Sequence, residues 1–133
     1  MRIVLDTNVL LVSISDRSKT HWIYEKLING EYELAVTNAI LNEYQEKITQ
    51  HWNAEVAQFV IRTLLELSNV NFITVFYRLN LIVSDPDDNA FVDCAFAANA
   101  HYIVSHDKHF DVLKNLDFPV IKVIRIDEFQ KVL

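Results

Sequence analysis

Short apolar runs alternate with amphipathic segments along the whole chain, and this alternation constrains the fold more than any other feature. Five short runs rich in β-branched residues predict strands, at residues 2–5, 33–36, 72–76, 102–105 and 120–124. Between and after them, helical spacing or capping chemistry predicts helices at residues 18–29, 38–51, 53–68, 85–100, 109–116 and 127–133. This order is typical of a parallel sheet with helices on both faces. We therefore expect an α/β fold, a three-layer α/β/α sandwich with a parallel sheet of about five strands.

The length suits one domain covering residues 1–133, because no linker or charge block divides the chain. Hydrophobic residues make up 51% of the chain, enough for a core, and the single Cys94 cannot form an internal disulfide. No apolar run approaches the roughly 18 residues of a membrane helix, and Asp6 interrupts the amino terminus before a signal-peptide core could form. These features predict a soluble, cytoplasmic protein that does not bind a membrane.

The charge balance of the chain is acidic. Eighteen Asp and Glu residues stand against twelve Lys and Arg residues, which gives a net charge of −6. A protein that holds nucleic acid by a general basic surface should instead be basic, so phosphate binding would depend on a few cations, such as Arg17, Lys19 and Lys108. The acidic excess is either a solubility feature or a sign that several carboxylates gather for one purpose.

Four acids are placed to gather at one edge of the predicted sheet. Asp6 directly follows the first strand, and Asp107 lies two residues after the fourth. The carboxyl ends of parallel strands share one edge of the sheet, so these two side chains should meet. Glu43 lies on the helix after the second strand, and Asp93 lies on the helix that opens at Asp85. Because Asp93 borders the apolar stripe of its helix, its carboxylate would be costly there without a cation or hydrogen-bond donors.

Each acid also has an ordinary explanation when it is taken alone. Asp6 and Asp107 can be turn or cap residues, and Glu43 can be a solvated helix residue. Helix capping is enough to explain Asp88, which lies about 140° around the helix from Asp93. We therefore keep Asp88 only as a possible accessory.

Gathered carboxylates form a hard-oxygen site that suits Mg²⁺ or Mn²⁺ rather than zinc. His106 and His109 do not make a zinc site, because no third His or Cys lies near them in the sequence. A dinucleotide-binding fold is excluded, because Gly30 is the only glycine and cannot make a glycine-rich phosphate loop. Paired divalent ions can activate water and stabilise the leaving oxygen of a phosphodiester.

The acids lie within longer stretches that carry a resemblance. These stretches are Ile3-Val4-Leu5-Asp6-Thr7-Asn8-Val9, Ile40-Leu41-Asn42-Glu43-Tyr44 and the block over residues 85–95 and 97–108. They resemble the PIN-domain (PilT amino-terminal domain) family of metal-dependent ribonucleases, in the VapC-like toxin branch of type II toxin–antitoxin systems. The resemblance places the metal-binding, catalytic acids on Asp6, Glu43, Asp93 and Asp107, and supporting polar positions on Asn8, Asn89 and Ser105, with Asp88 as an accessory. Ser105 stands where the family commonly has Thr, and His106 stands where it commonly has Gly.

The resemblance implies a Mg²⁺- or Mn²⁺-dependent endoribonuclease that hydrolyses RNA phosphodiester bonds. It further implies the toxin of a toxin–antitoxin pair, with a small antitoxin protein as partner and a homodimer as the oligomeric state. Two alternatives remain. The chain could be a non-catalytic or RNA-processing PIN-fold interaction domain that binds a protein or RNA partner. A phosphatase of the haloacid dehalogenase class is disfavoured, because it needs a second Asp where Asn8 stands.

Overall fold

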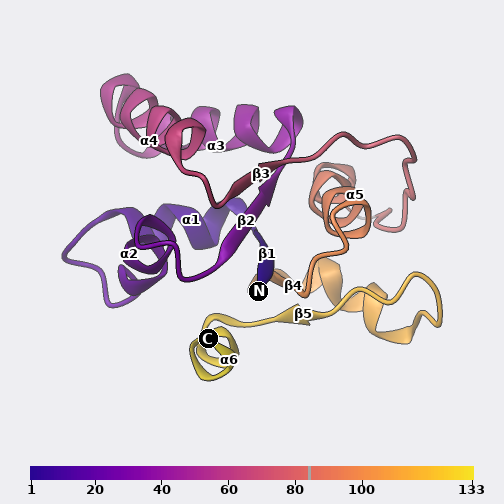
Figure 1. The fold of residues 1–133 in the computed structure, drawn as a ribbon. Helices are drawn as coiled ribbons and strands as arrows, with labels where there is room; N and C mark the ends of the chain where they lie inside the picture. Colours follow the sequence, from indigo (N-terminus) through magenta and orange to yellow (C-terminus); the bar gives the residue numbers. More distant parts are fainter. Residues whose placement is uncertain (84) are drawn as a thin grey trace.

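The structure, a computed structural model, describes residues 1–83 and 85–133 and is built on one parallel sheet (Figure 1). Its strands are β1 (Arg2–Leu5), β2 (Glu33–Val36), β3 (Val70–Phe72), β4 (Tyr102–Val104) and β5 (Val123–Ile124). Their order in the sheet is β3-β2-β1-β4-β5, and every neighbouring pair is parallel. The expected parallel sheet of five strands is therefore confirmed.

Helices cover both faces of this sheet. They are α1 (Thr7–Ile14), α2 (Trp22–Ile28), α3 (Asn38–His51), α4 (Ala54–Glu66), α5 (Asn89–Ala97) and α6 (Ile126–Val132), with 3₁₀ helices η1 (Pro86–Asp88) and η2 (Lys108–Asn115). Figure 1 shows α1, α2 and α6 on one side of the sheet and α5 on the other, which confirms the three-layer sandwich. None of the helices in the described ranges is both long enough and apolar enough to cross a membrane.

The central strand anchors the core. Ile3, Val4 and Leu5 of β1 are fully buried, as expected for a strand with neighbours on both edges and helices on both faces. Tyr44 of α3 is also fully buried, and its hydroxyl donates a hydrogen bond to the Leu5 carbonyl oxygen at 2.6 Å. This bond ties α3 to the last residue of β1, next to the first acid of the chain.

Three helix starts have the capping groups that the sequence predicts. The Thr37 hydroxyl accepts from the Ile40 amide at 3.2 Å at the start of α3. The Asn53 and Asp85 side chains cap α4 and η1 in the same way, at 2.9 and 3.2 Å. Each cap satisfies a backbone amide that has no partner within its own helix.

Other elements differ from the sequence prediction. Helix α1 was not expected, because residues 7–14 are apolar and β-branched and show no clear helical stripe. The third strand is β3 at Val70–Phe72 rather than residues 72–76, since Val70 to Phe72 pair with β2, whereas Phe76 is exposed and pairs with no strand among the described residues. The segment after Asp107 is a 3₁₀ helix, and β5 has only two residues.

Tyr44→Phe should lower stability by about 1 kcal/mol, because the Leu5 carbonyl loses a buried donor. In a domain of this size that corresponds to a loss of about 4 °C in Tm, measured by thermal unfolding. The matched control is Tyr77→Phe, whose parent side chain is exposed and which should change stability by less than about 0.5 kcal/mol. Equal losses in the two variants would contradict the structural role of the Tyr44 hydroxyl.

Candidate metal centre

Asp6 lies where the order of the strands reverses. From β1 the chain builds the sheet through β2 and β3 on one side, and then through β4 and β5 on the other. Leu5 pairs with Val104, and the Asp6 amide donates to the Val104 carbonyl oxygen at 3.1 Å. Crevices of parallel sheets form at such reversals, outside the carboxyl ends of the strands. Asp6 thus enters the crevice with its side chain buried.

Ser105 links the acids at the ends of β1 and β4. Its hydroxyl donates to Oδ2 of Asp6 at 2.7 Å and accepts from the backbone amide of Asp107 at 2.9 Å. One buried hydroxyl therefore fixes the Asp6 carboxylate and the turn that carries Asp107. This geometry needs a hydroxyl at position 105, which either Ser or Thr supplies.

Glu43 reaches the same region from α3. Its Oε2 accepts a hydrogen bond from the Thr7 hydroxyl, at the first residue of α1. Burial raises the pKa of Asp6, the hydrogen bond from Ser105 lowers it, and the charges of Asp107 and Glu43 raise it further. Asp6, Glu43 and Asp107 are therefore close enough to act on one another electrostatically.

Asp88 joins this group from η1, although the sequence suggested it only as an accessory. Its side chain is buried, and burial together with the charges of Asp107, Asp85 and Asp6 raises the pKa of Asp88 to about 7. A carboxyl group with such a pKa favours its protonated form, and a nearby cation favours the ionised form. The structure thus brings together Asp6, Glu43, Asp88 and Asp107.

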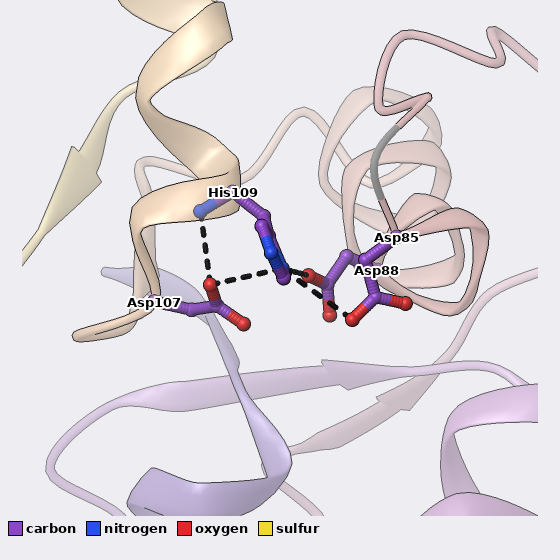
Figure 2. A group of neighbouring side chains, drawn as sticks. All are labelled: Asp85, Asp88, Asp107 and His109. Carbon is purple, nitrogen blue, oxygen red and sulfur yellow. Dashed lines mark hydrogen bonds and ion pairs between the residues drawn. The ribbon is translucent and has the colours of Figure 1, made fainter.

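Figure 2 shows the outer part of this site, formed by Asp85, Asp88, Asp107 and His109. Each contributes one potential ligand atom, and these four atoms lie within 4.8 Å of one another. Asp85 and His109 were not predicted from the sequence as members of this group, although the spacing of each is a usable signal. Residues three apart align in a 3₁₀ turn, as Asp85 and Asp88 do across η1. His109 lies two residues after Asp107, and its amide donates to Oδ1 of Asp107 at 2.9 Å in a tight turn.

Asp93 and Asn89 lie elsewhere and hold the segment that precedes η1. Oδ1 of Asp93 accepts from the Leu79 amide at 3.0 Å. The Asn89 side chain accepts from the Ile82 amide and donates to the Ile82 carbonyl oxygen, both at 2.9 Å. A backbone donor therefore compensates the buried Asp93 carboxylate. Among the described residues Asp93 makes no hydrogen bond or ion pair with Asp6, Glu43, Asp88 or Asp107, so the structure does not bring it into the acidic group.

Asn8 lies beside the acidic group on a cavity of about 260 Å³. The lining of this cavity combines the acids with apolar residues of α1 and α6, namely Asp6, Asn8, Val9, Val12, His106, Asp107 and Ile126. Asn8 is exposed, so it is available to a ligand in the cavity. His106 is also exposed at this rim, next to Asp107.

The donor set fits a divalent cation. Asp6, Glu43, Asp88 and Asp107 offer carboxylate oxygens, the ligands that Mg²⁺ and Mn²⁺ accept. Burial, together with the repulsion between these carboxylates, raises the pKa of Asp6 and of Asp88, and a bound cation would relieve both costs.

Asp88→Asn should stabilise the metal-free protein at pH 7.5. The pKa of Asp88 is raised to about 7 in the folded state, so the stability that its protonation provides is complete at low pH and is lost as the pH rises through 7. The uncharged amide avoids this loss. We expect a gain of about 1 kcal/mol, or about 4 °C in Tm in the presence of a chelator, and a smaller difference at pH 4.

Added Mn²⁺ should raise the Tm of the wild type more than that of Asp88→Asn. The neighbouring Asp87 is exposed, so Asp87→Asn is the control and should leave both measurements nearly unchanged. A lower Tm for Asp88→Asn than for the wild type, in chelator at pH 7.5, would show that burial and repulsion do not destabilise the ionised form of this carboxyl group.

Comparison with solved structures supports the fold. The crystal structure of VapBC2 from Rickettsia felis bound to a DNA fragment from their promoter matches with a TM-score of 0.65 and 18% identity, over 94% of this chain and 98% of that chain. The T. brucei RRP44 PIN domain matches with a TM-score of 0.53 and 13% identity, over 98% of this chain and 79% of that chain. Curated protein sequences give no match. The family profile described as PIN domain matches residues 2–109, most of the chain, and the chain therefore belongs to the PIN domain family.

Proposed function

We propose that this protein is a metal-dependent endoribonuclease of the cytoplasm, with residues 1–133 acting as one domain. The observation that carries the proposal is the convergence of Asp6, Asp88 and Asp107 from three separate segments of the chain at the strand-order reversal. Glu43 completes the group from α3. Membership of the PIN domain family supports a nuclease, and the resemblance of the motifs to the toxin branch favours RNA as the substrate.

The chain's own residues hold and orient the reacting groups. Asp6, Glu43, Asp88 and Asp107 are the proposed ligands of Mg²⁺ or Mn²⁺, and Ser105 holds Asp6 in place. A bound divalent cation supplies Lewis acidity, which polarises the phosphate and makes water a better nucleophile. Asn8 at the rim and the exposed Lys108 beside Asp107 can bind the RNA backbone. The acidic net charge makes RNA binding depend on these few groups and on the cation.

Asp6→Asn, Asp88→Asn and Asp107→Asn should each lower the rate of RNA cleavage at least about 100-fold, because each removes a proposed cation ligand. Asp93→Asn is the matched control. Its amide oxygen still accepts the Leu79 hydrogen bond, so its rate should stay within about threefold of the wild type. The measurement is cleavage of single-stranded and structured RNA, and of DNA of the same sequence, with Mg²⁺, Mn²⁺ or chelator.

The controls separate the alternatives. Cleavage that persists in chelator, or in all three ligand variants, would reject the metal-dependent mechanism. Loss of activity in Asp93→Asn but not in Asp88→Asn would restore the ligand set that the sequence resemblance implies. Binding of RNA without any cleavage would favour the non-catalytic interaction domain.

We further propose that the protein is the toxin of a toxin–antitoxin pair and forms a homodimer. The fold similarity to VapBC2 supports a partner of this kind. A basic segment of a small antitoxin suits the cavity beside Asp6 and Asp107, because it would place positive charge against the carboxylates and apolar side chains against Val9, Val12 and Ile126.

Induced expression of the wild type should arrest growth, and expression of Asp6→Asn should not, because growth arrest requires cleavage. Co-expression of a small reading frame that overlaps or adjoins the gene should restore growth. The measurement is colony formation after induction, with protein amounts compared by immunoblot. Normal growth with active, abundant wild-type protein would reject the toxin role while leaving the nuclease proposal intact.

A further inference from the structure

His109 places a ring nitrogen among carboxylates from two parts of the chain. Its Nδ1 lies 3.1 Å from Oδ1 of Asp107, 3.2 Å from Oδ2 of Asp88 and 3.4 Å from Oδ2 of Asp85 (Figure 2). Asp107 and His109 belong to the start of η2, whereas Asp85 and Asp88 belong to η1. Two segments that are distant in sequence therefore meet around one nitrogen atom, since Asp88 and His109 are 21 positions apart.

The spacing of these four groups suits a common cation. Ligands held at about 2.1–2.2 Å from one ion lie at most about 4.4 Å from one another. The four candidate atoms lie within 4.8 Å of one another, so small side-chain rotations bring them to that spacing. The His109 side chain is 42% exposed, which leaves a path for an ion from solvent.

Backbone contacts orient two of these acids in advance. Oδ1 of Asp85 accepts the Asp87 amide at 3.2 Å, so the other oxygen of this carboxylate is the one that faces His109. Oδ1 of Asp107 accepts the His109 amide at 2.9 Å, which fixes the acid relative to the ring. Geometry that is held by the backbone is a feature of metal sites, since ordering the ligands beforehand lowers the cost of binding.

We propose that His109 is a metal ligand through Nδ1, together with Asp85, Asp88 and Asp107. The inference rests on the proposed function, because Asp88 and Asp107 are shared with the proposed nuclease centre. One imidazole nitrogen among carboxylate oxygens favours first-row transition ions such as Mn²⁺ and Co²⁺ over Mg²⁺, which prefers oxygen ligands. The site therefore selects Mn²⁺ over Mg²⁺.

The alternative role of His109 is that of a counter-ion, and the two roles predict opposite effects of removing the ring. A protonated imidazole would compensate the carboxylates by itself, and its removal would strengthen the binding of any divalent cation. A ligand contributes a bond, and its removal weakens the binding of those ions that accept nitrogen.

The experiment measures metal binding by the full chain without RNA, by calorimetric titration at one fixed pH. For His109→Ala we expect the Kd for Mn²⁺ to rise at least tenfold and the Kd for Mg²⁺ to stay within about threefold. His51→Ala is the control, because His51 is an exposed histidine at the last residue of α3, and it should leave both constants unchanged. Thermal unfolding in chelator checks that each variant is folded.

A second measurement reports the ligand directly. The visible spectrum of the Co²⁺-loaded protein should change in His109→Ala and remain that of the wild type in His51→Ala, because the ligand field of cobalt depends on the nitrogen donor. His109→Asp replaces nitrogen by oxygen and should keep Mg²⁺ binding and recover Mn²⁺ binding while losing the preference for Mn²⁺. This variant also keeps the test valid if His109→Ala does not fold.

Failures of the two proposals are distinguishable. Equal or tighter Mn²⁺ binding in His109→Ala, or an unchanged Co²⁺ spectrum, overturns the role of His109 even if the protein cleaves RNA. A wild type that binds Mn²⁺ through His109 but does not cleave RNA keeps this inference and rejects the nuclease. A wild type that binds no divalent ion overturns both.

Discussion

The fully buried residues 3–5 of the central strand leave no room for charge, and the position of the site follows from this constraint. β1 pairs with β2 on one edge and with β4 on the other, and its residues Ile3, Val4 and Leu5 are fully buried. A carboxylate within such a strand would lose its hydration without gaining partners. The first acid therefore comes where β1 ends, at Asp6, and the reversal of strand order opens a crevice at the same point. The remaining acids belong to the site because α3, η1 and η2 deliver them to this crevice.

Neutral hydrogen-bond donors orient three of these acids, although the carboxylates repel one another. The Ser105 hydroxyl donates to Asp6, the Thr7 hydroxyl donates to Glu43, and the His109 amide donates to Asp107, so each of these three carboxylates has a neutral hydrogen-bond donor. Burial and like charge raise the pKa of Asp6 and Asp88 at the same time. Burial and like charge therefore destabilise the ionised carboxylates when no metal is bound, and they favour the binding of a divalent cation. Stability and cation affinity are opposed at this site, as at many functional sites.

Most of the fold was predictable because strands and helices alternate with clear periods. The parallel sheet, the α3 and α4 starts at Thr37 and Asn53, and the start of η1 at Asp85 all follow local patterns that the structure confirms. Helix α1 was missed because its apolar residues do not form a clear helical stripe, and β-branched side chains alone do not indicate a helix there. The aromatic residues after β3 suggested a longer strand, but Phe76 is exposed and pairs with no neighbouring strand among the described residues.

The sequence by itself determined the order of strands and helices, and with it the edge of the sheet at which Asp6 and Asp107 meet. Those properties depend on residues that are close along the chain. Only the tertiary structure decided that Asp88 rather than Asp93 joins the acids at this edge, because the positions of η1 and α5 are set by what these helices pack against. Asp93 instead accepts a hydrogen bond from the Leu79 amide. The place of His109 was likewise decided by tertiary structure, since its contact with Asp88 joins two segments that only the packed fold brings together.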